Sequence, residues 1–100
     1  MTYFTKKAVA RHIRKKHPGC PEFAVIYIAE RIASKDWDAM TLGAAVGTTM
    51  QGIMRHTMTD YDALLLAGVD RLEARMRVQS RVNALLATWA KPREEKAGGV

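Results

Sequence analysis

The sequence predicts an all-α fold, a compact bundle of four or five helices. Apolar residues recur at helical spacing through most of the chain, and proline or glycine residues interrupt that spacing where helices are expected to end. The one run rich in β-forming residues, at positions 23–28, has no second run to pair with, so a strand there is the weaker alternative. Because 48% of the 100 residues are apolar, we expect one domain over residues 1–90 and a flexible tail over residues 91–100.

The first helix is expected over residues 6–16. Thr5 is placed to cap it, and Phe4 is placed to pack against Val9 one turn inside. Val9 and Ile13 supply its narrow apolar stripe. All six basic residues of the first 17 positions occupy the rest of its surface, and no acidic residue accompanies them: Lys6, Lys7, Arg11, Arg14, Lys15 and Lys16.

A second helix is expected to follow a turn at residues 17–21, because proline and glycine there stop the first helix. Pro21 suits the first position of this helix, which we expect to reach Ser34. Its apolar residues at helical spacing, on which the helix prediction rests, are Phe23, Ile26 and Tyr27.

A third helix is expected over residues 41–57 at the centre of the bundle, because apolar side chains cover a wide arc of it. Gly43 and Gly47 lie four residues apart and should let another helix approach closely. One predicted stripe consists of Leu42, Val46, Thr49 and Ile53. A second stripe consists of Met50, Met54 and Met58, which we interpret as core, with an adaptable partner-binding surface as the alternative.

Two further helices complete the predicted fold. Thr59 caps a short fourth helix, and Gly68 ends it. Its leucines, expected to be buried, are Leu64, Leu65 and Leu66. Asp70 caps the fifth helix, with Glu73 completing a capping-box pattern. The apolar residues at helical spacing on the fifth helix are Leu72, Met76, Val78, Val82, Leu85, Leu86 and Trp89.

Charge is unevenly distributed along the chain, whose net charge is +6. Residues 1–17 carry six basic and no acidic side chains, residues 18–70 carry three basic and seven acidic ones, and residues 71–100 carry seven basic and three acidic ones. This pattern predicts separate electrostatic faces and favours a polyanionic partner, although a merely solvated basic surface gives the same pattern.

A zinc site is the first chemical alternative, because His12, His17 and Cys20 lie close together in the sequence. No fourth ligand is near them, and His56 is distant. On one helix, positions 12 and 17 point about 140° apart. We therefore expect no metal and no other cofactor, and the single cysteine fits a reducing, cytoplasmic setting.

Acidic, basic and phenolic side chains gather where the third and fourth helices are expected to meet. A general base built on His56 with Asp60 and Tyr61 is the enzymatic interpretation. The structural interpretation is stronger: His56 complements the end of one helix, and Asp60 and Asp62 complement the start of the next. No nucleophile is adjacent, so we expect a chain without enzymatic activity.

The run from Ile53 to Leu65 resembles the signature of the domain of unknown function 2293 family, in which Ile-Arg-His leads into Thr-Asp-Tyr-Asp and two leucines. The resemblance covers about residues 9–90 and implies a helical fold. It also implies a role for the family-motif junction, made up of Arg55, His56, Thr59, Asp60, Tyr61 and Asp62. Where longer members carry a glycine-rich basic loop, this chain has residues 34–38, so a function resting on that loop is not implied here.

The sequence thus predicts a non-enzymatic binding module whose basic first helix contacts nucleic acid or an acidic protein surface. The alternative is a protein-binding module, such as a phage or mobile-element inhibitor of a host protein complex. We expect no membrane association, because no apolar run is long enough to span a bilayer, and no signal peptide. Self-association through the third or fifth helix stays open.

Overall fold

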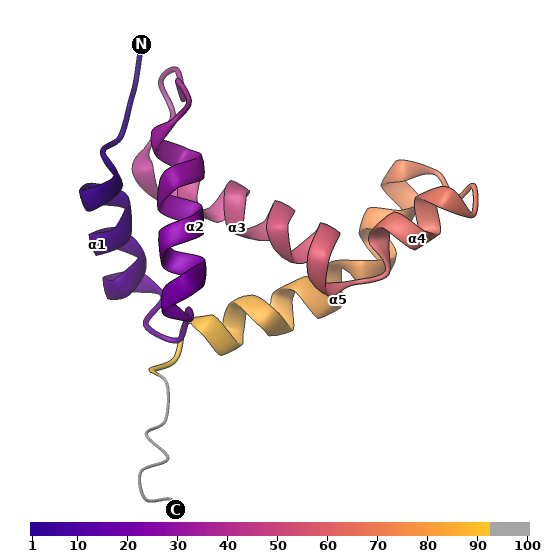
Figure 1. The fold of residues 1–100 in the computed structure, drawn as a ribbon. Coiled ribbons are helices and arrows are strands. Elements are labelled where there is room, and N and C mark those ends of the chain that lie inside the picture. Colours follow the sequence, from indigo (N-terminus) through magenta and orange to yellow (C-terminus); the bar gives the residue numbers. More distant parts are fainter. Residues whose placement is uncertain (93–100) are drawn as a thin grey trace, which may run out of the picture.

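In the computed structural model, which describes residues 1–92, the chain forms five α-helices (Figure 1). They are α1 (Lys6–Lys16), α2 (Glu22–Ala33), α3 (Leu42–Met58), α4 (Tyr61–Leu66) and α5 (Arg71–Trp89). The predicted all-α fold is therefore confirmed. A strand at residues 23–28 is wrong, because these residues lie within α2. The predicted tail begins with Lys91 and Pro92, and its other residues lie outside the described part of the chain.

The central place predicted for the third helix is confirmed, since α3 contacts each of the other four helices. Helices α1 and α2 lie side by side, and α3 leaves this pair to form an arm with α4 and α5 (Figure 1). Helix α5 then returns along α3 toward the α1–α2 turn (Figure 1). The arrangement is flat, with Cα extents of 47 × 41 × 16 Å. None of the described helices is both long and apolar enough to cross a bilayer.

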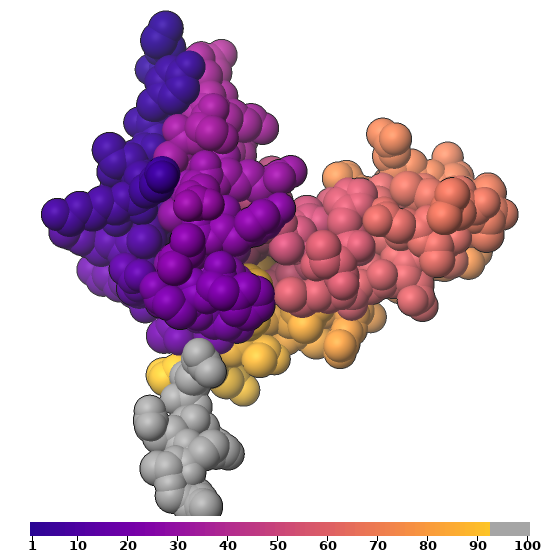
Figure 2. All heavy atoms as spheres, viewed as in Figure 1, coloured from indigo at the N-terminus to yellow at the C-terminus, as the bar shows by residue number. Residues whose placement is uncertain are grey.

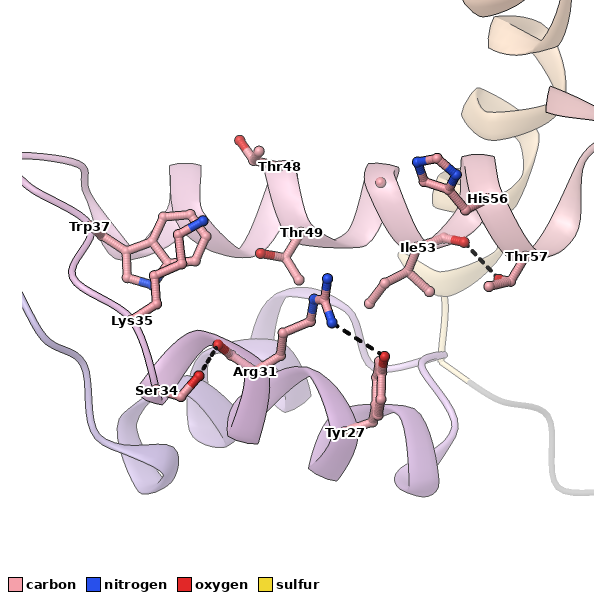
Figure 3. A pocket seen from close by; sticks show the side chains of 11 residues that line it. Tyr27, Arg31, Ser34, Lys35, Trp37, Thr48, Thr49, Ile53, His56 and Thr57 are labelled. Carbon is pink, nitrogen blue, oxygen red and sulfur yellow. Dashed lines mark hydrogen bonds between the residues drawn. The ribbon is translucent and has the colours of Figure 1, made fainter. Parts of the chain in front are cut away.

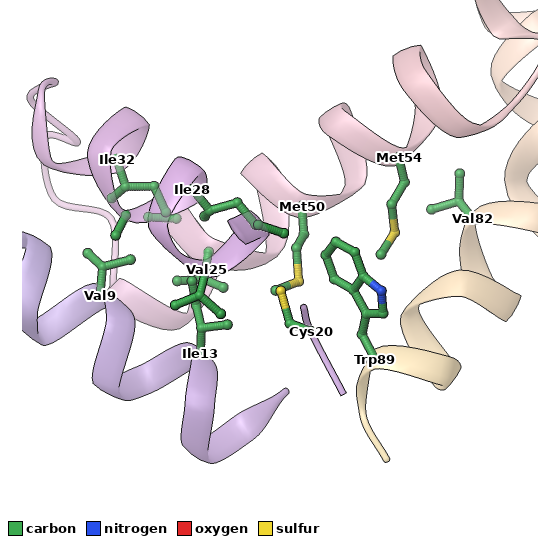
Figure 4. Packing of buried hydrophobic residues seen from close by; sticks show 14 of the residues in the cluster. Val9, Ile13, Cys20, Val25, Ile28, Ile32, Met50, Met54, Val82 and Trp89 are labelled. Atoms are coloured by element: carbon green, nitrogen blue, oxygen red, sulfur yellow. The ribbon is translucent and has the colours of Figure 1, made fainter. Parts of the chain in front are cut away.

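The core forms where α1, α2, α3 and the end of α5 meet. Met50 and Met54 are fully buried, and Figure 4 shows the Trp89 ring between them. The methionine stripe is thus core as predicted, except that Met58 at the end of α3 is 36% exposed. The other fully buried large side chains are Val9, Ile13, Val25, Ile28, Ile32, Val46 and Val82.

The apolar residues whose spacing predicted the second helix do not form its buried face. Phe23 is 75% exposed, Ile26 50% and Tyr27 51%. The face that packs on α1 and α3 instead carries Ala24, Val25, Ile28, Ala29 and Ile32. Apolar residues surround nearly all of α2, so helical spacing alone does not decide which side is buried. The two alanines on the buried side allow the neighbouring helices to approach.

Burial was also overestimated at the far end of the arm. Leu66 is 90% exposed, and Leu72 and Met76 on α5 are 65% and 67% exposed. Leu64 and Leu65 are partly buried, as expected. At this end only α3, α4 and α5 meet, so each of them has a covered side and an open side (Figure 1).

The close helix approach predicted at Gly43 and Gly47 is wrong. No atom would lie within 4 Å of a Cβ at Gly47, and at Gly43 only the His12 side chain is near. The close approach occurs at Gly19, in the turn between α1 and α2. Its N–H donates to Trp89 O at 2.8 Å, and a Cβ there would lie 2.6 Å from Thr88 O. Gly19 therefore lets the end of α5 close against the turn.

The caps predicted at Thr5 and Asp70 are confirmed, whereas the N-cap residue of α4 is Asp60 and not the predicted Thr59. Thr5 Oγ1 accepts from the Ala8 N–H, and Asp70 accepts from the N–H groups of Leu72 and Glu73. Helix α4 ends at Leu66, and Gly68 follows its C-cap as expected, with a φ of 93° in the left-handed region that glycine adopts freely. The Glu73 side chain does not serve a capping box, because its carboxylate accepts from Arg77 Nε at 3.0 Å.

Candidate nucleic-acid interface

The outer surface of α1 is the most basic helix face of the described chain. Its two buried residues, Val9 and Ile13, lie on the side that meets α2 and α3. All six basic side chains predicted to contact an anionic partner are exposed: Lys6, Lys7, Arg11, Arg14, Lys15 and Lys16. Figure 2 shows α1 along one edge of the molecule, where no other helix covers it.

Four of these cations line one shallow hollow on α1: Lys7, Arg11, Arg14 and Lys15. Arg14 is already paired, because its guanidinium donates to the Glu22 carboxylate on α2. This hydrogen bond raises the pKa of Arg14 and lowers the pKa of Glu22. No other α1 cation has a carboxylate partner within the described residues. Lys7, Arg11 and Lys15, each four residues apart, are thus the cations available to a partner.

The arginines of α5 do not extend this surface. They lie between Arg71 and Arg81, in the first half of α5, while the Trp89 end of the helix meets the α1–α2 turn. Helices α1 and α5 share no close contact. The structure therefore separates two basic regions, the α1 face and the outer part of α5, at opposite ends of the flat molecule (Figure 1).

The family-motif junction is built around Tyr61, which is 4% exposed. The His56 ring meets the Tyr61 ring edge-on at 5.2 Å, and the Arg55 guanidinium lies 5.7 Å from its centre. His56 Nδ1 is 2.7 Å from Asp62 Oδ1, so Asp62 is its partner and Asp60 is not. Thr59 Oγ1 donates to Arg55 O and accepts from the Tyr61 N–H. These contacts fix the angle between α3 and α4.

The Arg55 side chain is the least satisfied part of this junction. Its Nε is buried without a hydrogen-bond partner among the described residues. Burial, and then the nearby positive charge of Arg75, lower the pKa of Arg55. The Tyr61 ring acts in the opposite direction, because its electron-rich face stabilises the positive charge of the Arg55 guanidinium.

The residues considered for zinc do not converge. Helix α1 ends at Lys16, and the bend at His17 brings its ring to 6.4 Å from that of His12. Burial lowers the pKa of both histidines. Cys20 points away into the core beside Met50 (Figure 4), and burial raises the pKa of its thiol to about 11. Among the described residues, no three His, Cys, Asp or Glu side chains are placed to share a metal ion.

A groove of about 600 Å³ between α2 and α3 was missed by sequence reasoning (Figure 3). Arg31 and Lys35 line it from the α2 side, and His56 lies on α3. Trp37 closes one end, where its Nε1–H donates to Ile32 O and Lys35 Nζ lies 4.4 Å above its ring. The available sequence signal was the four-residue spacing of Tyr27 and Arg31, which places them on one face of α2, whereas Lys35 lies beyond the end of the helix and reaches the groove through the tertiary structure.

Comparison with known families gives one match. The model of the family described as an uncharacterized conserved protein family, DUF2293, matches residues 12–90. The match includes the junction and most of the described fold, but it begins after Lys6, Lys7 and Arg11. No curated protein and no solved structure matches the chain.

Proposed function

This chain belongs to the DUF2293 family, and because the family description names no activity, we propose a function from the surface of the chain itself. It is a non-enzymatic binding module whose basic first helix contacts nucleic acid. The observation that carries the proposal is the exposed cationic face of α1, on which Lys7, Arg11 and Lys15 have no carboxylate partner among the described residues.

The electrostatics of α1 support a phosphate backbone as the partner. Like charges at Lys7, Arg11 and Lys15 repel one another along the helix, which costs stability that a neutral surface would not cost. An anion placed along the hollow relieves this repulsion. Flexible lysine and arginine side chains suit phosphate contacts, which fix position without reading sequence, so the binding is expected to be independent of base sequence.

The experiment is fluorescence anisotropy with a labelled DNA duplex and a labelled single-stranded RNA at several salt concentrations. The test variant carries Lys7→Glu, Arg11→Glu and Lys15→Glu, which leave the Arg14–Glu22 pair intact. Wild type should bind with an affinity that falls steeply as salt rises. The variant should bind weakly, with a salt slope shallower by about 3, because each lost phosphate contact removes about 0.9 from the slope.

A matched control separates the α1 surface from net charge. Arg71→Glu, Arg75→Glu and Arg81→Glu change the net charge by the same amount on exposed positions of α5. This control should keep the wild-type salt slope. Equal losses in the two triple variants would show that overall charge is responsible, and absence of binding by wild type at low salt would end the proposal. Far-ultraviolet circular dichroism checks that each variant stays helical.

The second candidate is a protein-binding module, and the exposed apolar residues of α2 favour it. Phe23 and Ile26 lie exposed away from the buried face of α2, with the half-exposed Tyr27 beside them at the groove, and together they expose more apolar surface than a solvated helix needs. An apolar interface changes little with salt, whereas phosphate binding weakens steeply. Capture of a protein that survives high salt, and is lost on Phe23→Ala with Ile26→Ala, would favour this candidate over nucleic acid.

A further inference from the structure

We propose that the groove between α2 and α3 binds the terminal phosphate of a small phosphorylated ligand of nucleotide size. The site is separate from the α1 surface, because no residue of α1 lines the groove. The proposal is therefore independent of the nucleic-acid function.

The charge of the groove favours an anion. Its lining includes the permanent cations Arg31 and Lys35 and no carboxylate from the described residues, and His56, which also lines it, is paired with Asp62 outside the lining. Within residues 1–92, the Arg31 guanidinium donates to one side chain, Tyr27 Oη, at a long 3.5 Å, so most of its five N–H donors stay available. Figure 3 shows the Arg31 side chain reaching from α2 toward α3 across the groove. Two permanent cations in one concavity match the two negative charges of a phosphate monoester better than the single charge of a diester.

The hydroxyl groups of the groove divide into two kinds. Ser34 and Thr57 donate to backbone carbonyls of their own helices, at 3.0 and 2.6 Å, so their protons are used. Thr49 is 8% exposed and is the buried polar residue of the described core. Its side chain lines the groove in front of Arg31 (Figure 3). The Thr49 hydroxyl is therefore placed to donate to an anion bound there.

The volume of the groove and its apolar wall indicate that it accommodates a ligand larger than a bare anion. A volume of about 600 Å³ lies within the range of about 300–1,000 Å³ that small-molecule sites occupy. Ile53 and the rings of Tyr27 and Trp37 provide apolar surface beside the cations. This combination suits a phosphate attached to a flat organic group, as in a nucleoside monophosphate.

The test is a titration of the isotope-labelled protein by nuclear magnetic resonance with adenosine monophosphate, inorganic phosphate and adenosine. The phosphate-bearing probes should shift the Trp37 indole and Gly52 amide signals in a saturable way, and adenosine should not. Arg31→Gln and, separately, Lys35→Gln should each weaken adenosine monophosphate binding about tenfold, since each removes a charged hydrogen bond. Arg71→Gln at an exposed position of α5 has the same charge change outside the groove and outside the α1 face, and should leave the affinity unchanged.

Several results would overturn the proposal. These are the absence of saturable shifts in the millimolar range, shifts with adenosine equal to those with adenosine monophosphate, or equal weakening of binding by Arg71→Gln and Arg31→Gln. A dinucleoside monophosphate, which carries only a diester, separates the two sources of phosphate. If it bound as well as adenosine monophosphate, the groove would be a nucleic-acid contact. The α1 triple variant leaves the groove intact, so it should lose DNA binding and still show the signal shifts of the groove residues with adenosine monophosphate. The two proposals can therefore fail independently.

Discussion

His17 stands where α1 ends, with Nδ1 buried and without a hydrogen-bond partner among the described residues. Burial first, and the neighbouring His12 second, lower its pKa from the ordinary value of 6.5. The unfolded chain therefore binds a proton at His17 in a pH range where the folded chain does not. Folding stability is fully present above pH 6.5 and falls as the pH drops below it.

We accordingly predict that the free energy of unfolding, measured with urea, decreases as the pH falls from 7 to about 5. His17→Gln should reduce this decrease, because the variant has no imidazole to protonate on unfolding. Asp36 and Glu22, whose pKa values are lowered, lose their contribution only at more acidic pH. Identical pH dependence in wild type and variant between pH 7 and 5 would contradict the assignment.

The Thr59 hydroxyl joins two helices, since it donates to Arg55 O at 2.5 Å and accepts from the Tyr61 N–H at 3.1 Å. Thr59→Ala removes both hydrogen bonds and should lower the free energy of unfolding by about 1 kcal/mol. Thr48→Ala is the matched control, because Thr48 lies exposed within α3 and alanine favours the helix slightly. A smaller loss at Thr59 than at Thr48 in urea denaturation would refute the role of the junction.

The helices themselves were predicted to within one or two residues because their ends depend on local chemistry. Thr5, Thr41, Asp70 and Gly68 satisfy backbone groups only a few residues away, so they act the same in any tertiary context. The buried faces were predicted less well. On α2 the apolar side chains surround the helix, and only the positions of α1 and α3 decide that Ile28 is buried and Phe23 is not.

Packing between elements makes Gly19 the glycine that the fold requires. Gly19→Ala would place a Cβ 2.6 Å from Thr88 O, with the Lys91 carbonyl also in its way, so the end of α5 must move off the α1–α2 turn. We expect a loss of about 1–3 kcal/mol of unfolding free energy. Gly47→Ala meets open space inside α3 and should stabilise the protein by about 0.5–1 kcal/mol. In urea denaturation, the free energy of unfolding should fall in the Gly19 variant and rise in the Gly47 variant. A change of the same sign in both variants would contradict the close approach at Gly19.

At the scale of the whole molecule, stability should fall from the hub of α1, α2 and α3 toward the end of the arm. Helix α4 has six residues and one buried side chain, Tyr61, whereas α2 buries five. We predict that backbone amides of α4 exchange with deuterated water faster than those of α2 and of α3 around Met50. Protection of α4 equal to that of α2 would show that the arm does not open on its own.

Self-association through the third or fifth helix stays a prediction. The structure favours α5 over α3 as the associating helix, because α3 is covered by four neighbouring helices while α5 exposes Leu72 and Met76. Leu66 on α4 adds to the exposed apolar surface at this end of the arm.

The sequence by itself determined the helices, the caps at Thr5 and Asp70, the basic face of α1 and the burial of Met50 and Met54 in the core. Each of these features depends on the spacing of residues within one helix or on contacts between residues a few positions apart in the sequence. Only the tertiary structure decided which face of α2 is buried and that Asp62 is the partner of His56. It also decided that the end of α5 approaches the α1–α2 turn closely at Gly19. It alone placed Arg31 and Lys35 in one groove opposite Thr49. Such pairings join residues on different elements, and no local pattern records the angle at which two helices meet.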